Sequence, residues 1–268
     1  MKDENLHTFV VLAYKESPYL EDCIRSLVRQ TVKSNIILTT STPSSFLTNI
    51  AARYSIPLFI NNSREGIASD WNFAYSTCAT KLLTLAHQDD IYFPIYSEEL
   101  LRIGRIYTDC LIIFPWYNEL QVNNKTRKES AILRAKKMIL FLFAGKGKIR
   151  SRWKKRLLLS FGNPISCPGV VYNKSNIGNF KFSKQFTSNM DWEAWRLLSD
   201  KPGSFCYHNK LLFSHRIHAQ SATTACIENN LRHEEDVLML RRFWPSILIK
   251  IISFFYSFAF LSNQKEEN

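Results

Sequence analysis

The sequence lacks the cysteine pattern of disulfide frameworks and structural zinc sites. Its six cysteines are far apart, with no C-x-x-C pair and no His/Cys cluster, so we predict neither kind of cross-link and expect reduced thiols in a cytoplasmic setting. The first seven residues have no apolar segment behind a basic start, so we expect no ordinary secretory signal. The final apolar stretch, residues 247–261, contains Lys250 and is shorter than the roughly 20 residues that span a bilayer. It either lies on a membrane or packs against the fold.

Acidic residues are nearly missing from one segment, residues 125–156. This segment holds thirteen Lys or Arg residues against the single acid Glu129, whereas the 22 basic and 22 acidic residues elsewhere in the chain balance. The formal net charge of +12 is therefore a local property. We expect this segment to bind an anionic partner.

The chain has 268 residues, 46% of them hydrophobic, and is long enough to bury a large core. Up to residue 86, apolar runs alternate with segments whose apolar residues recur at helical spacing. We expect strands at 8–13, 35–40, 57–60 and 81–86. We expect helices between them at 18–28, 46–54 and 67–78, the first capped by Ser17 and opened by Pro18. This order predicts an α/β fold with a doubly wound, mostly parallel sheet flanked by helices.

Beyond residue 94 the pattern is less regular. We expect a helix to about residue 107, strands at 111–114 and 169–172, and helices at 191–199 and 228–243.

Paired carboxylates follow the fourth predicted strand directly. The apolar run ending at Ala86 continues into His87, Gln88, Asp89 and Asp90, and ligands bind at the carboxyl ends of strands in open α/β sheets. Adjacent carboxylates repel each other and any anionic ligand unless a cation lies between the carboxylates and the ligand. The ions Mg²⁺ and Mn²⁺ prefer carboxylate oxygens as ligands. The pair by itself also fits a solvated turn before a proline.

Further motifs stand around this pair. They are the opening strand, turn and helix at 10–31, the Arg-Glu-Gly-Ile-Ala run at 64–68 with Trp71 and Asn72, the Asn-Met-Asp-Trp-Glu-Ala-Trp run at 189–195, and the Ser-His-Arg-Ile-His-Ala-Gln-Ser run at 214–221. In this order, and with 87–90 as the D-x-D-D segment, they resemble the motifs of glycosyltransferase family 2. The resemblance covers roughly residues 8–223 and implies a GT-A fold and a nucleotide-diphosphate-sugar donor.

The resemblance also implies roles, carried over residue by residue. Asp89 would be the chief metal-binding carboxylate with Asp90 beside it, and His218 would complete the contacts to metal or diphosphate. Asp191 would be the base that takes the proton of the acceptor hydroxyl, while Mg²⁺ or Mn²⁺ would stabilise the departing diphosphate. Direct displacement implies inversion at the anomeric carbon. The implied donor contacts are Ala13, Tyr14, Glu16, Thr39, Gly66, Asn72, Gln88 and Asp89.

Two positions depart from the family pattern. His87 replaces the first Asp of D-x-D, so it either joins Asp89 as a ligand or donates a hydrogen bond to diphosphate. Residues 38–43 carry hydroxyl side chains where the family has an acidic pair for the nucleotide. Glu16 is either a nucleotide contact or an exposed turn acid.

Other residues have a structural interpretation beside the functional one. Asp191 also fits a helix-start acid favoured by the helix dipole. We interpret His215 as a structural histidine and leave it out of the site. Trp192 and Trp195 are expected to pack their helix rather than to stack on sugar.

The basic segment has an apolar stripe at helical spacing, formed by Ile132, Ala135, Met138, Ile139 and Leu142. A basic amphipathic stretch of this kind suits an anionic membrane surface. The cations expected to contact it are Lys136, Lys137, Lys154, Lys155 and Arg156. Binding to nucleic acid also fits the charge but matches no known motif and leaves the acidic pair unexplained. A solvated cationic face is the third interpretation.

The sequence therefore predicts three parts. Residues 1–115 form the nucleotide-sugar-binding half, residues 116–225 the acceptor-side half with the basic segment, and residues 226–268 a helical, membrane-associating tail. The expected activity is sugar transfer to a glycan acceptor, lipid-linked, for cell-surface polysaccharide at the inner face of the membrane, with no nucleic acid partner. The alternatives are a catalytically silent nucleotide-sugar-binding protein and a basic nucleic-acid-binding protein.

Overall fold

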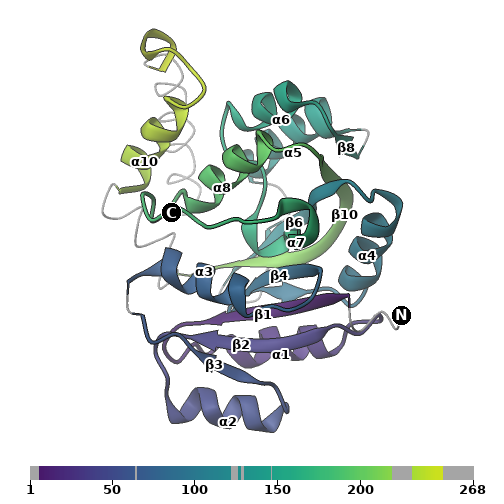
Figure 1. Ribbon diagram of the computed structural model, residues 1–268, viewed down its shortest axis with the longest axis vertical. Helices are drawn as coiled ribbons and strands as arrows, with labels where there is room; N and C mark the ends of the chain where they lie inside the picture. The colour runs from purple at the N-terminus through teal and green to yellow at the C-terminus, as the bar shows by residue number, and fades with distance from the viewer. Residues whose placement is uncertain are drawn as a thin grey trace.

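The computed structural model describes residues 6–63, 65–121, 126–127, 130–145, 147–218 and 231–249. Within these residues a ten-stranded sheet follows the order β3-β2-β1-β4-β9-β6-β10-β5, with β7 paired to β6 and β8 paired to β10. Figure 1 shows this sheet with helices on both of its sides.

The first half of the sheet is parallel and consists of β1 (His7–Ala13), β2 (Asn35–Thr40), β3 (Leu58–Ile60) and β4 (Leu82–His87). Three helices connect these strands: α1 (Leu20–Val28), α2 (Ser45–Arg53) and α3 (Ile67–Thr77). The chain runs outward from β1 through β2 to β3. It then returns past β2 and β1, so that β4 lies on the other side of β1. Right-handed crossovers therefore place α1 and α3 on opposite sides of the sheet (Figure 1).

The second half is built around two long parallel strands, β6 (Cys110–Gln121) and β10 (Ser204–Ile217). The short strand β9 (Val171–Asn173) is antiparallel between β4 and β6, and β5 (Ile91–Tyr92) is antiparallel to the end of β10. The remaining elements are α4 (Tyr96–Ile106), β7 (Thr126–Arg127), α5 (Ala131–Ala144), β8 (Lys148–Ile149), α6 (Arg152–Leu159), the 3₁₀ turn η2 (Cys167–Gly169), α7 (Lys174–Ile177), α8 (Met190–Ser199) and α10 (Leu231–Leu240). The predicted mostly parallel sheet flanked by helices is confirmed.

Several predicted boundaries were wrong. The strand expected at 111–114 is the start of the twelve-residue β6, and the strand expected at 169–172 begins later because η2 occupies 167–169. The sequence did not reveal β10, because its polar middle, residues 208–210, interrupts the apolar pattern where the strand register shifts.

Two helix starts also differ from their predictions. The expected cap at Ser17 does not start α1, which begins at Leu20 and has no side-chain cap bond at its first turn. The helix expected from residue 228 is described from Leu231 onward, and residues 228–230 lie outside the described part of the chain. Among the described residues, no helix is both long enough and apolar enough to cross a bilayer, and residues 250–261 of the final apolar stretch are not among them.

The basic segment folds into α5, β8 and α6, which lie together above the second half of the sheet in Figure 1. Within it Lys155 is fully buried, and its Nζ donates to the carbonyl oxygens of Lys201 (2.7 Å) and Gly203 (3.0 Å). Burial lowers the pKa of this lysine to about 8. The expectation that Lys155 contacts a membrane was wrong, because two carbonyl groups and the Phe205 ring surround its ammonium group.

Replacing Lys155 by methionine is expected to lower the free energy of unfolding by about 1–3 kcal/mol, because two buried carbonyl groups lose their donor. Urea unfolding followed by circular dichroism measures this change. The matched control is Lys154→Met, since Lys154 is the exposed neighbour on the same helix and should leave stability within about 0.5 kcal/mol of the parent. Equal losses in the two variants would show that Lys155 has no special structural role.

Candidate active site

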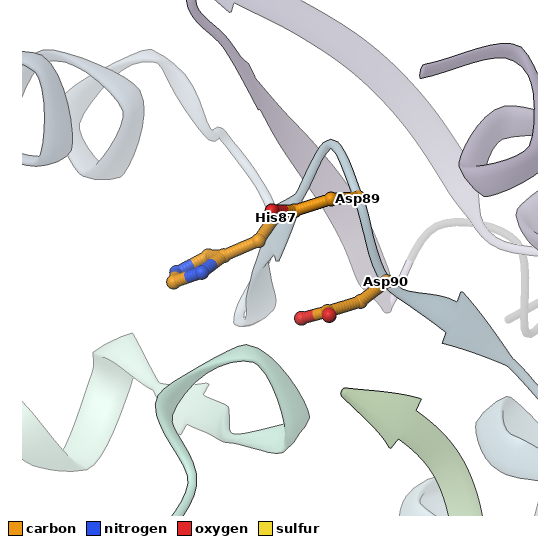
Figure 2. A group of neighbouring side chains, drawn as sticks. All are labelled: His87, Asp89 and Asp90. Atoms are coloured by element: carbon orange, nitrogen blue, oxygen red, sulfur yellow. The ribbon is translucent and has the colours of Figure 1, made fainter. Parts of the chain in front are cut away.

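A group of three side chains lies on the loop that joins β4 to β5. His87 ends β4, and Asp89 and Asp90 follow within the turn. One potential ligand atom from each residue lies within 4.8 Å of the others, and Figure 2 shows the three side chains extending to the same side of the loop. Because β4 is the innermost of the four parallel strands, with β1 on one side and the antiparallel β9 on the other, the group stands at the carboxyl edge of these strands.

Asp90 is fully buried and is held by the end of β10. Its Oδ1 accepts from the Nδ1 of His215 (3.0 Å) and from the backbone N–H of Arg216 (2.8 Å). Burial lowers the pKa of His215, but the Asp90 carboxylate outweighs this and raises it to about 9. Among the described residues, the Oδ2 atom of Asp90 is buried without a hydrogen-bond partner.

His87 presents a second unpaired atom to the same space. Its Nε2 is buried with no partner in the described part of the chain, and burial lowers the pKa of its ring. A neutral imidazole has a lone pair that can bind a metal. An unpaired nitrogen and an unpaired carboxylate oxygen at this spacing fit a divalent cation, with His87 in the place of the missing carboxylate.

Asp89 is joined to His218, which directly follows β10. The Nε2 atom of His218 lies 2.8 Å from Oδ2 of Asp89, and Nε of Arg216 donates to the backbone oxygen of Asp89 (2.9 Å). Burial raises the pKa of Asp89, but the His218 hydrogen bond and the neighbouring histidines outweigh it, so the net pKa is lowered. Three residues from the end of β10 therefore hold the loop after β4, across more than 120 positions of the chain.

Asp191 lies in the first turn of α8. Its Oδ2 accepts from Nδ2 of Asn163 (2.7 Å), and its Oδ1 accepts from the backbone N–H of Trp192 (2.7 Å). Burial raises the pKa of this carboxylate, which makes it a stronger base than an exposed aspartate. Asp191 also lies near enough to His87 for its negative charge to raise the pKa of that ring, against the larger effect of burial.

The loops after β1 and β4 are bonded to each other. Gln88 accepts from the backbone N–H of Tyr14 (3.0 Å) and donates to its carbonyl oxygen (3.1 Å). Ala13 is buried at the end of β1, whereas Tyr14 and Glu16 are exposed on the turn that follows. The structure thus brings Ala13, Tyr14 and Gln88 together at one edge.

A sequence model of one family, Glycosyl transferase family 2, matches residues 8–163. This is more than half of the chain. The chain belongs to glycosyltransferase family 2. The match includes β1, β4 and the loop that carries His87, Asp89 and Asp90.

Solved structures share the fold of this family 2 chain. Residues 1–349 of S. aureus TarS match with a TM-score of 0.57 and 11% identity over 79% of this chain and 60% of that one. The same protein in complex with UDP-GlcNAc matches with a TM-score of 0.55 and 11% identity over 82% and 61%. At this identity the likeness shows the GT-A fold alone. The chain spans about three fifths of the TarS fragment, and a comparison with curated proteins gave no match.

Of the three other predicted donor contacts of the family 2 chain, two form hydrogen bonds with the backbone and one borders open space. The Thr39 hydroxyl is buried and donates to the carbonyl of Val11 (3.3 Å), and both ends of the Asn72 amide bond the backbone of Phe182 (2.9 and 2.7 Å). Gly66 directly precedes α3 and has a φ of +86°. A Cβ atom added at this glycine would have no heavy atom of the described residues within 4 Å, so this part of the backbone borders open space. Their donor contacts stay predictions.

The sequence analysis missed Asp70 and Asn163. Asp70 on α3 accepts from the hydroxyl of Ser41 (2.8 Å) and the amide of Asn61 (2.8 Å). It therefore brings a carboxylate to the ends of β2 and β3, where the family's acidic pair is missing from this sequence. Asp70 lies within the 64–72 motif but was not singled out there, and Asn163 belongs to no quoted motif, so their contacts reveal both residues. Trp192 and Trp195 are fully buried, as predicted.

Proposed function

We propose that this family 2 glycosyltransferase moves a sugar from a nucleotide-diphosphate sugar to a glycan acceptor with inversion, assisted by a divalent metal. The observation that carries the proposal is the pair of buried atoms that have no partner among the described residues, Nε2 of His87 and Oδ2 of Asp90, beside Asp89 and near enough to Asp191 for its charge to act on His87. A donor that binds at this edge has its diphosphate next to the metal ligands, and the acceptor then lies on the side of Asp191.

Each group has a separate role in the proposed mechanism. His87, Asp89 and Asp90 would hold the cation, with His218 bonded to Asp89. When bound, the cation would supply Lewis-acid stabilisation of the negative charge on the diphosphate. Asp191 accepts the proton of the acceptor hydroxyl as that oxygen attacks the anomeric carbon, the bond from this carbon to the diphosphate oxygen breaks, and the nucleoside diphosphate leaves. Asn163 keeps the Asp191 carboxylate oriented.

The donor is tested first with UDP-GlcNAc, since the TarS complex with this compound supports a uridine-diphosphate sugar for the shared fold. Thermal unfolding of the purified protein is compared across a panel of nucleotide sugars, with and without Mn²⁺. A ligand that binds the native state raises the unfolding temperature by mass action. A metal-dependent shift supports the proposal, and no shift with any donor would count against it.

A catalytically silent binder is the second candidate, and the replacement of the first motif Asp by His87 favours it. The two candidates differ in turnover. The silent binder holds a donor in calorimetry but releases no nucleoside diphosphate from it, whereas the enzyme releases one.

We propose further that the acceptor is lipid-linked and that α5 and α6 meet an anionic membrane at the inner face of the cell membrane. The side chains of Phe141 and Trp153 are 74% and 67% exposed, and Met138 and Leu142 are exposed beside Phe141. Exposed lysines, among them Lys137, accompany these apolar side chains. Exposed apolar side chains accompanied by cations suit the headgroup region of anionic lipid.

The combined variant Lys137→Gln, Lys154→Gln, Phe141→Ser is expected to lose binding to phosphatidylglycerol vesicles. Each cation near such a surface is worth about 1 kcal/mol, so the two charge changes alone weaken partitioning roughly thirtyfold. Vesicle sedimentation measures the loss. Lys33→Gln is the matched control on an exposed loop elsewhere, and equal sedimentation of variant and parent would mean that this face binds no membrane.

A further inference from the structure

A buried carboxylate from α10 holds the turn that leads into α8. Glu235 is 4% exposed, and its Oε1 accepts from the backbone N–H of Thr187 (2.8 Å). Its Oε2 accepts from the backbone N–H groups of Ser188 (2.8 Å) and Asn189 (2.7 Å). One side chain therefore binds three consecutive amide groups, and bonds from N–H groups to a carboxylate are among the stronger hydrogen bonds in proteins.

The three N–H groups that Glu235 binds belong to the residues directly before α8, and the side chain at the N-cap of α8 makes no capping bond. Asn189 is the N-cap residue of α8 but makes no capping bond within its helix. Its Nδ2 donates instead to Oδ1 of Asp236 on α10 (2.7 Å), and Arg232 on α10 donates to the hydroxyl of Ser188 (3.1 Å). Buried backbone N–H groups without partners are costly, so α10 supplies what the local sequence lacks.

The contacts of α10 end two residues before Asp191. Glu235 fixes the backbone up to Asn189, and Asn163 holds the Oδ2 atom of Asp191. We propose that Glu235 is a positioning residue for the reaction, acting through the 187–189 turn to set where Asp191 stands. This inference rests on the proposed role of Asp191 as base.

The isosteric change Glu235→Gln tests the inference with little loss of packing. A glutamine has one acceptor oxygen and one NH₂ group, so at least one of the three amides meets a donor instead of an acceptor. The matched control is Glu234→Gln, because Glu234 is the exposed neighbour on the same helix.

Hydrogen exchange measures whether Glu235 holds the turn, and it does not depend on catalysis. In Glu235→Gln the amides of residues 187–189 should exchange at least tenfold faster than in the parent, while the central strand β1 keeps its protection and shows that the fold is intact. In Glu234→Gln all rates should stay parental. Unchanged exchange at residues 187–189 in Glu235→Gln would overturn the proposal.

Kinetics then measure whether the turn positions the base. The readout is UDP release from UDP-GlcNAc in the presence of Mn²⁺, with water as acceptor. A misplacement of about 1 Å can cost on the order of 10²-fold in rate, so kcat of Glu235→Gln should fall roughly 10- to 100-fold, with KM for UDP-GlcNAc within about twofold of the parent. A parental kcat in this variant, when Asp191→Asn is inactive, would overturn the positioning role alone. A parental kcat in Asp191→Asn itself would show that the base lies elsewhere and would remove the premise of the positioning role. No release of nucleoside diphosphate by the parent from any nucleotide sugar of the panel would show that the proposed enzymatic function has failed. In both cases exchange at residues 187–189 would still decide whether Glu235 holds the turn.

Discussion

Replacing Asp191 by asparagine is expected to lower the rate of sugar transfer by about 10² to 10⁴, the usual contribution of a positioned general base. The amide has the shape of the carboxylate but cannot take the proton of the acceptor hydroxyl. Donor binding should be unchanged, because Asp191 belongs to the acceptor side of the proposed site. UDP release from UDP-GlcNAc measures the rate, and calorimetry with the same compound measures the binding.

The pH dependence offers a second measurement on the same residue. Burial raises the pKa of Asp191, so the parental rate should already fall at acidic pH values where an exposed aspartate is still ionised. This acidic limb should be missing from the small residual rate of Asp191→Asn.

The competing interpretation of Asp191 is an acid that only stabilises the start of a helix. Asp22 lies in the first turn of α1 and provides the matched control. If Asp191→Asn and Asp22→Asn each cost about 0.3–1 kcal/mol of stability and both keep the parental rate, then the base lies elsewhere.

Replacing Asp89 by alanine is expected to abolish the part of donor binding that depends on metal. The Oδ1 of Asp90 is already engaged by His215 and Arg216, so one carboxylate oxygen and the His87 nitrogen would remain as ligands. These two atoms are too few to hold a divalent ion against the repulsion of a diphosphate. Calorimetry with UDP-GlcNAc should therefore give the same weak affinity with Mn²⁺ and with EDTA.

The variant His87→Ala tests whether His87 is a metal ligand or a hydrogen-bond donor to the diphosphate. It should weaken metal-supported binding less than Asp89→Ala, and by different factors for Mg²⁺ and Mn²⁺, because nitrogen and oxygen ligands differ in metal preference. Donor affinity in Asp89→Ala that equals the parental value in Mn²⁺ would remove Asp89 from the metal site.

The sequence by itself determined the first half of the fold and the location of the acidic pair. The strands β1 and β4 are short, buried and mostly apolar, β2 and β3 each contain a run of three apolar residues, and the helices between the strands have helical periodicity. Both patterns are local, so they can be seen without the fold. The ordered motifs around Asp89 also placed the chain in its family, since each motif is a run of neighbouring residues.

The tertiary structure decided everything that depends on contacts between distant residues. The sequence analysis treated His215 as structural, but the fold places it against Asp90, and Asp70 reaches the end of β2 from a helix. Lys155 has the same charge as its exposed neighbour Lys154, and only the packing of α6 makes it buried. Glu235 is one of several acids on its helix, and its role arises because α10 docks where α8 has no cap of its own. Hydrogen-bond partners that are far apart in the chain leave no periodic pattern in a sequence, so the fold alone assigns them.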